Sequence, residues 1–142
     1  MKPSGRESAT LSVIRRCARV LLGAFLVFAG VAHLSFARSE FTAQVPTWLP
    51  VDLVVFASGV VEIALGVALL VLARRQVLVG WLTAAFFVLV FPGNVHQFLS
   101  HADAFGLDSD RARAIRLLFQ PLLVLWALWC TGAWAAWRSR RR

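Results

Sequence analysis

The sequence has few of the features that usually identify an enzyme. It has two cysteines, Cys17 and Cys130, and no Cys-x-x-Cys pair. It therefore lacks the adjacent dithiol with which a membrane thiol oxidase passes electrons by disulfide exchange. The two cysteines could form a disulfide with each other or simply pack as small apolar residues. A phosphate-binding glycine loop, a nucleophile elbow and a haem attachment motif are also absent, so no motif names a reaction.

Metal-binding patterns are equally scarce. The histidines and aspartates between residues 96 and 110 do not have an ordinary zinc or calcium spacing; they are His96, His101, Asp103, Asp108 and Asp110. We interpret the last two aspartates as part of a solvated loop that leads into a helix. The sequence therefore predicts no metal site.

Acidic residues are few, and apolar residues are in large excess. The 142 residues include 7 acids and 15 lysines and arginines, which gives a net charge of +8, and 59% of the residues are hydrophobic. The mean hydropathy is +0.72. A soluble chain of one-domain length could not bury so much apolar surface. We therefore expect a membrane protein.

Four apolar runs are long enough to cross a hydrocarbon layer of about 30 Å as helices of roughly 20 residues. They are also longer and more continuous than the strands of a membrane barrel. The first run exceeds the apolar part of a typical secretory signal, so we expect it to be retained. The fold class predicted is all-α, a polytopic four-transmembrane-helix bundle. The expected parts are a disordered basic segment at residues 1–14, a helical domain at 15–137 with helices near 17–36, 53–73, 77–98 and 117–137, and a basic tail at 138–142.

The basic residues are concentrated on one side of this arrangement. Most lie before the first helix, between the second and third, or after the fourth, whereas the acids gather in the other two loops. The positive-inside rule then places both termini in the cytoplasm, across a bacterial-type cytoplasmic membrane. Membrane lipids are the expected partners of these basic ends. Nucleic acid is not expected, because basic residues do not interleave with exposed aromatic ones.

Glu62 stands alone in the apolar run from Ser58 to Leu72. Helical spacing puts it on one face with Gly59 and Gly66, and Gly23, Gly30 and His33 form a similar stripe on the first helix. Small residues allow helices to approach closely in lipid, so we expect both stripes to be helix–helix contact faces and Glu62 to point into the bundle. An acid inside a membrane is by default a candidate functional residue.

Each helix contributes a polar group to the outer half of the expected bundle, and the inner half contributes almost none. The candidate pocket is formed by His33, Glu62, Asn94, Arg116 and Gln120, with Phe28, Phe91 and Trp126 as its wall. The alternative is structural: Asn94 and Gln120 could bind carbonyl groups freed by Pro92 and Pro121. The loop before the second helix, with Trp48, could cap the pocket or simply connect the helices.

Five short motifs together resemble the DoxX family of small membrane proteins. In order, they are FAGVAH (28–33), PTWLP (46–50), GVVEIALG (59–66), FPGN (91–94) and RLLFQP (116–121). The resemblance covers roughly residues 15–137 and implies a four-helix bundle. The family is similar to membrane subunits of thiosulfate:quinone oxidoreductase. It therefore implies a role in membrane redox chemistry, with quinone as the cofactor to consider.

Three functions remain open from the sequence. The first is an accessory subunit of quinone-linked redox chemistry, in which Glu62 or His33 handles protons and electrons come from a redox partner subunit. The second is an assembly subunit without chemistry. The third, a small proton-linked carrier acting as a homo-oligomer, is disfavoured because no inverted repeat is evident.

Overall fold

The computed structural model describes residues 5–104, 106 and 109–141, and side chains from residue 9 onward in these ranges. Every regular element in this part of the chain is helical. The elements are α1 (Gly5–Leu34), α2 (Arg38–Thr42), α3 (Val51–Val71), the 3-10 turn η1 (Ala73–Arg75), α4 (Gln76–Leu99), α5 (Asp110–Cys130) and α6 (Ala133–Arg140). The all-α prediction is confirmed.

Four of these helices are long and apolar enough to cross a membrane. The qualifying segments are Ala9–Leu34, Val51–Val71, Ala73–Leu99 and Asp110–Cys130. Large apolar side chains such as Leu89 and Leu118 are 75% and 67% exposed on their outer surfaces. A soluble protein rarely exposes so many such side chains together. The four helices thus indicate a multi-pass membrane protein.

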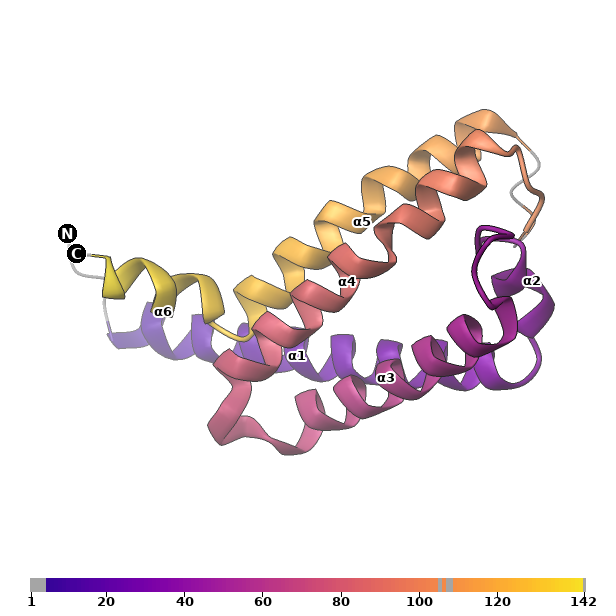
Figure 1. Cartoon of the computed structure of the whole chain (residues 1–142). Helices are drawn as coiled ribbons and strands as arrows, with labels where there is room; N and C mark the ends of the chain where they lie inside the picture. The colour runs from indigo at the N-terminus through magenta and orange to yellow at the C-terminus, as the bar shows by residue number, and fades with distance from the viewer. Residues whose placement is uncertain (1–4, 105, 107–108, 142) are drawn as a thin grey trace.

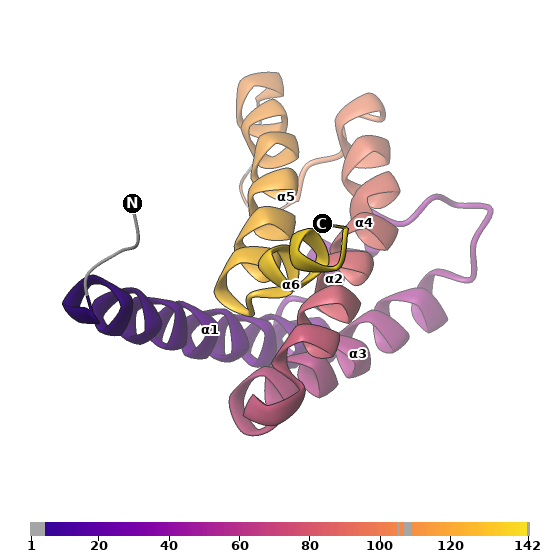
Figure 2. The ribbon, with the colours of Figure 1, turned by 90° about the vertical axis from the view of Figure 1, so that its left-hand side faces the viewer.

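The four long helices pack as two antiparallel pairs, α1 with α3 and α4 with α5 (Figure 1). Both termini lie at one end of the molecule, which we call the terminal end. The opposite end, which carries α2 and the loop between α4 and α5, is the loop end. The two pairs meet at the terminal end and diverge toward the loop end (Figures 1 and 2).

The buried apolar core lies where the pairs meet. It includes Leu22 and Leu26 of α1, Leu69 of α3, and Ala127 of α5, which are at most 1% exposed. At the loop end the pairs depend on fewer shared contacts. Polar side chains there are therefore held mainly within one helix pair or the other.

Glycine contacts explain the close packing of α1 on α3. A Cβ atom added to Gly30 would lie 2.6 Å from the carbonyl oxygen of Gly59, and one added to Gly66 would lie 2.7 Å from that of Gly23. Only glycine allows the two backbones to approach so closely. Both small-residue stripes are helix–helix contact faces, as predicted, and the structure shows in addition that they contact each other.

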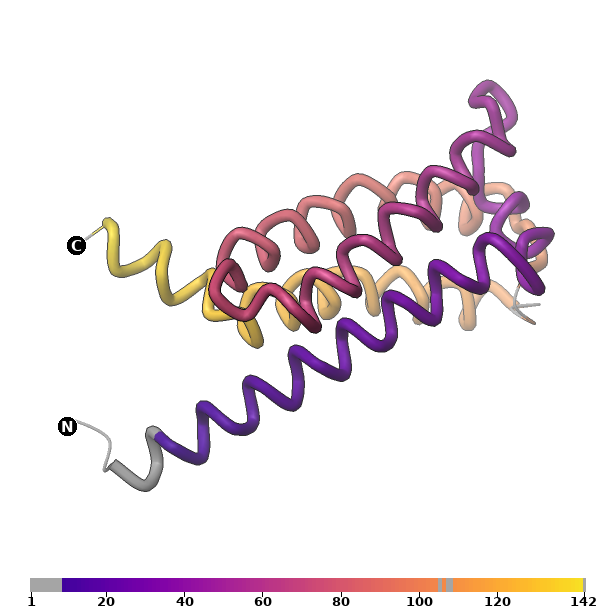
Figure 3. Tube along the Cα trace, turned by 90° about the horizontal axis from the view of Figure 1, so that it is seen from below, coloured from indigo at the N-terminus to yellow at the C-terminus, as the bar shows by residue number. Residues whose placement is uncertain are grey.

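Two of the expected boundaries are wrong. Residues 5–14 are helical rather than disordered, and α1 and α6 both extend beyond the turn between α3 and α4 at the terminal end (Figure 3); residues 1–4 lie outside the described part. The fourth helix occupies Asp110–Cys130, about seven residues earlier than expected. It stops because Gly132 has a left-handed conformation, with φ of 71°, as is common after a helix C-cap.

The end of the chain is likewise a separate element. Residues 133–137, which we expected to complete the fourth helix, begin α6 instead, and α6 continues into the expected basic tail. Arg142 lies outside the described residues. The basic character of the tail is unaffected, because Arg138 and Arg140 lie in the last turn of α6.

Candidate functional site

His33 and Glu62 form the closest approach of two ionisable side chains between α1 and α3. The Nδ1 atom of His33 lies 2.8 Å from Oε2 of Glu62, and the two residues are 8% and 9% exposed. The pairing follows from the local sequence, because Glu62 lies between Gly59 and Gly66 on the face that packs against α1. The acid therefore faces another helix rather than lipid.

The surroundings of His33 hold its ring in place. Its Nδ1 atom is 3.0 Å from the carbonyl oxygen of Ala29, one turn earlier in α1. Its ring stacks on that of Phe41 in α2, with centroids 3.2 Å apart and planes 20° apart. His33 is the penultimate residue of α1, so α2 covers the pair where α1 ends. The ring is thereby shielded on one face.

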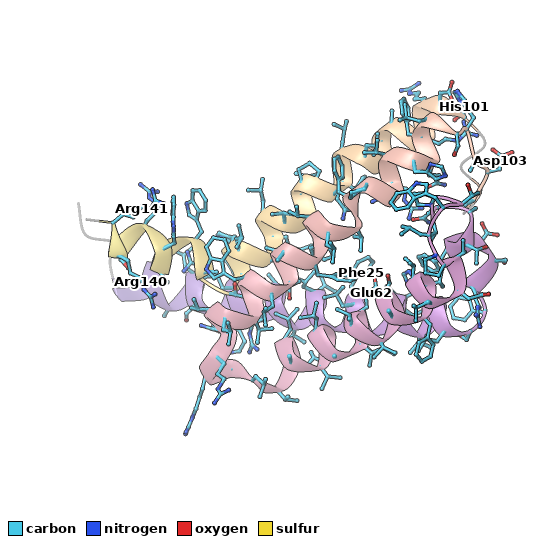
Figure 4. All side chains as sticks on the ribbon, viewed as in Figure 1. Phe25, Glu62, His101, Asp103, Arg140 and Arg141 are labelled. Atoms are coloured by element: carbon cyan, nitrogen blue, oxygen red, sulfur yellow. The ribbon has the colours of Figure 1, made fainter. Side chains whose placement is uncertain are left out.

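The geometry of the pair is suited to proton exchange. Nδ1 lies close to both a carbonyl and a carboxylate, yet Oε2 of Glu62 has no aligned hydrogen-bond partner among the described residues. A neutral ring with its proton on Nδ1 can donate a hydrogen bond to the Ala29 carbonyl, and a doubly protonated ring can pass the Nδ1 proton to the carboxylate and become neutral. In Figure 4, Glu62 and Phe25 lie on the side of the α1–α3 pair that faces α4 and α5.

A second polar pair joins α4 to α5. Nδ2 of Asn94 donates to Oε1 of Gln120 at 2.9 Å, and Nε2 of Gln120 donates to the carbonyl oxygen of Phe87 at 2.6 Å. Asn94 and Gln120 are 8% and 7% exposed. The structural alternative to the pocket was that these amides bind the carbonyl groups left free by proline. Gln120 does bind a carbonyl in the turn before Pro92, although it is that of Phe87, five residues before the proline.

Arg116 contacts the loop between α2 and α3. Its Nη2 atom donates to Oε1 of Gln44 at 3.1 Å. Gln44 is 9% exposed, and its Nε2 atom is buried without a hydrogen-bond partner among the described residues. The backbone oxygen of Gln44 also lies beside Gly93 of α4. The loop thus reaches across the loop end to both helices of the second pair, as the capping alternative expected.

The predicted pocket is therefore divided into three contacts. The structure pairs His33 with Glu62, Asn94 with Gln120, and Arg116 with Gln44. Among the described residues, no hydrogen bond or ion pair joins the first of these contacts to the second. The divergence of the helix pairs (Figure 1) explains the separation. Gln44 was missed because a loop residue has no helical period to reveal its contacts.

The three aromatic residues predicted as the pocket wall do not form one. Phe28 is 64% exposed and packs against Phe36, with ring centroids 6.0 Å apart. Trp126 donates from Nε1 to the carbonyl oxygen of Ala18 at 3.2 Å, which places it nearer the terminal end. Phe91 is 37% exposed beside the proline kink of α4. These residues lie on different surfaces, because the expected wall ignored the direction in which each helix faces.

The terminal end contains more polar groups than we expected. Arg19 is 6% exposed and donates from Nη1 to the carbonyl oxygen of Leu69 in the last turns of α3. Thr131 is fully buried and donates from Oγ1 to the carbonyl of Ala127 at 2.6 Å. The sequence alone places Arg19 with the basic residues at the cytoplasmic ends of the helices. Its place one turn after two other arginines, just inside the apolar run, was the available signal.

Two cavities lie at the terminal end, and none of the predicted site residues lines either. The larger, of about 580 Å³, is lined by α1, η1 and the start of α4. The smaller, of about 190 Å³, lies along α5 and α6. Arg15 lines both.

The cysteines and the carboxylates considered as metal ligands do not form a site among the described residues. Cys17 and Cys130 are both free thiols, the first exposed and the second buried. At the loop end, the buried Arg113 pairs with Asp103 at 2.5 Å and with Asp110 at 2.7 Å. These carboxylates therefore hold an arginine, and the described residues contain no cluster of metal ligands. Asp108 lies outside the described part.

Comparison with known proteins gives one match. A family model described as Domain of unknown function (DUF8561) matches residues 22–131. The match runs from the middle of α1 to the residue after α5, so it includes the second half of α1, the whole of α3, α4 and α5, and every residue of the candidate site. No curated protein and no solved structure matches the chain.

Proposed function

This chain belongs to the DUF8561 family, and we propose that it is a membrane subunit that handles protons for a quinone-linked redox reaction. The observation that carries the proposal is the buried contact between His33 and Glu62, at 2.8 Å. Buried ionisable pairs within membrane helices are found mainly on proton and substrate pathways. The resemblance of its motifs to the DoxX family supports the same reaction class.

The chemical role of the pair follows from the reaction. Reduction of a quinone to a quinol takes up two electrons and two protons. In this proposal the electrons come from a redox partner subunit, and Glu62 and His33 deliver protons to the quinone oxygens.

The membrane and the orientation are also proposals. Arg15, Arg16, Arg74, Arg75, Arg138, Arg140 and Arg141 all belong to the terminal end, and the acidic residues Asp52, Asp103 and Asp110 to the loop end. By the positive-inside rule the terminal end faces the cytoplasm of a bacterial-type cell. The His33–Glu62 pair then lies in the outer half of the cytoplasmic membrane.

Quinone retention tests the proposed function. The protein is purified in detergent without added quinone, extracted with organic solvent, and its quinone content per chain is measured by chromatography. We expect the natural protein to retain quinone and Glu62→Gln to retain at least about tenfold less, since loss of a hydrogen bond to a charged group costs about 1.5–3 kcal/mol.

Asp52→Asn is the matched control, because the Asp52 side chain is 84% exposed and pairs with Arg38 at the surface. It removes one carboxylate from the same helix without touching the buried pair. We expect it to retain as much quinone as the natural protein. Absence of quinone from the natural protein, or equal retention by Glu62→Gln, would contradict the proposal.

A second function, assembly without chemistry, is favoured by one observation. Asn94 and Gln120 direct their hydrogen bonds to each other and to the Phe87 carbonyl, as expected of residues that only fix helix packing. If the protein is isolated without quinone, and a partner subunit co-purifies equally with the natural chain and with Glu62→Gln, this second function replaces the first.

A further inference from the structure

The cavity of about 580 Å³ at the terminal end has an unusually basic lining. Three arginines of α1 contribute to it, namely Arg15, Arg16 and Arg19, together with Ser12 and Gln76. None of the described residues that line it is acidic. Arginines gathered along one recess without an acid attract an anion by Coulomb interaction. The composition therefore calls for an anionic occupant.

The individual arginines differ in how far the protein already satisfies them. Arg19 is bound to the Leu69 carbonyl and is fixed in place. Arg15 has a buried Nε atom without a hydrogen-bond partner among the described residues, and its guanidinium lies 5.9 Å from the centre of the Trp129 ring. Arg16 is exposed at the rim. Arg15 thus keeps donor capacity that a phosphate could use.

The second cavity, of about 190 Å³, favours a lipid over a free anion as the occupant. It also includes Arg15, but the rest of its lining is largely apolar, with Leu125, Leu128, Trp129 and Trp134. A basic cavity and an apolar one therefore meet at a single arginine. This is the arrangement that a phosphate with an attached hydrocarbon chain requires, and a free phosphate would use only the basic half.

We propose that the terminal end binds one anionic phospholipid, with its phosphate between Arg15 and Arg16 and its glycerol and acyl part directed along α5 and α6. Basic recesses between membrane helices bind such headgroups on the cytoplasmic side, which agrees with the orientation proposed above. Arg19 positions the site, because it joins α1 to the end of α3. The inference does not depend on a quinone function.

Titration with lipid tests the proposal. The full-length protein, in an uncharged detergent, is titrated with phosphatidylglycerol, and bound lipid is counted by native mass spectrometry. We expect one tightly bound phosphatidylglycerol per chain. Because a basic residue near an anionic headgroup typically strengthens binding about fivefold, Arg15→Gln combined with Arg16→Gln should weaken binding roughly 30-fold.

Arg74→Gln combined with Arg75→Gln is the matched control. Both arginines are exposed on η1 at the same end, and neither lines the basic cavity. The two double variants remove the same charge, and an uncharged micelle offers no anionic surface to attract η1. We expect less than a twofold change in the control. An equal loss in both would show general attraction rather than a site and would overturn the proposal.

Two further ligands separate the sources of phosphate. Phosphatidylcholine, which has no net charge, should bind at least about fivefold more weakly than phosphatidylglycerol, and equal binding contradicts the proposal. Inorganic phosphate at millimolar concentration should not displace the lipid; displacement with equal dependence on Arg15 would identify a free-anion site instead. Should the double variant fail to fold, Arg16→Gln alone, at an exposed position, provides the same test with an expected loss of about fivefold.

Discussion

At the scale of single residues, the chain separates its buried polar side chains into small groups with different chemistry. The amide pair of Asn94 and Gln120 can only donate and accept hydrogen bonds, whereas His33 and Glu62 can also exchange a proton. Both pairs are more than 90% buried. The amide pair therefore shows how much a buried hydrogen bond without proton exchange contributes to the free energy of unfolding.

A double-mutant cycle on the amide pair measures that contribution. Asn94→Ala, Gln120→Ala and the double variant should show a coupling of about 0.6 kcal/mol, the average for hydrogen bonds between membrane helices. Unfolding in mixed micelles provides the free energies. Gln120→Ala should cost more than Asn94→Ala, because Gln120 also binds the Phe87 carbonyl. A coupling near zero would mean that the two amides do not contact each other in the folded protein.

At the scale of helices, glycine contacts decide how α1 and α3 approach each other. Gly23 and Gly66 contact each other reciprocally, whereas Gly30 lies against the Gly59 carbonyl and Gly59 against the side chains of His33 and Leu34. The second contact adjoins the ionisable pair, because a Cβ on Gly59 would lie 2.9 Å from the Cβ of His33. The distance between His33 and Glu62 thus depends on the absence of side chains at these glycines.

Gly30→Ala should therefore destabilise the protein by about 1–3 kcal/mol, as overpacking typically does. Its new methyl group would lie 2.6 Å from a backbone oxygen, so the helices must move apart. Gly93→Ala is the control, since its methyl group would meet the Gln44 oxygen at 3.4 Å, an ordinary contact. Alanine is the better helix former by about 1 kcal/mol, so a Gly30→Ala protein that unfolds at a higher temperature would refute this packing.

The long helices and their glycine faces could be predicted from the sequence, because apolar length and a period of 3.6 residues are local signals. The same period brought Glu62 and His33 together correctly. The predictions that were wrong or missing concerned the direction in which side chains point and the contacts made by loop residues. The expected pocket wall of Phe28 and Trp126 ignored which way each side chain points, and Gln44 reaches Arg116 through a loop without periodicity.

Two boundary errors have more local causes. The basic start of α1 was read as disordered from its polarity, although polar residues extend a helix readily once it leaves the membrane. The end of α5 had a recognisable signal in Gly132, which adopts the left-handed conformation that stops a helix. Arg19 shows the remaining limit: its positive charge suggested the surface, and only the position of Leu69 in space reveals its partner.

At the scale of the whole molecule, the two ends differ in both packing and charge. At the terminal end the helix pairs share a dense apolar core and carry the arginines of α1, η1 and α6 (Figure 4). At the loop end the pairs diverge, and Asp103 and Asp110 hold Arg113. Since basic loops resist translocation more than acidic ones, this asymmetry leads to a definite orientation.

Reporter fusions in a bacterial host test that orientation. Green fluorescent protein fused after Arg142 should fluoresce, because it folds in the cytoplasm, and alkaline phosphatase fused there should be inactive. Alkaline phosphatase inserted after Ala104, in the loop between α4 and α5, should be active because that loop is outside. Replacing Arg74 and Arg75 with glutamine should raise the fraction of inverted chains, since those arginines follow the second span directly. The opposite pattern of reporter activity would move the His33–Glu62 pair to the cytoplasmic half and the arginine cavity to the outer leaflet.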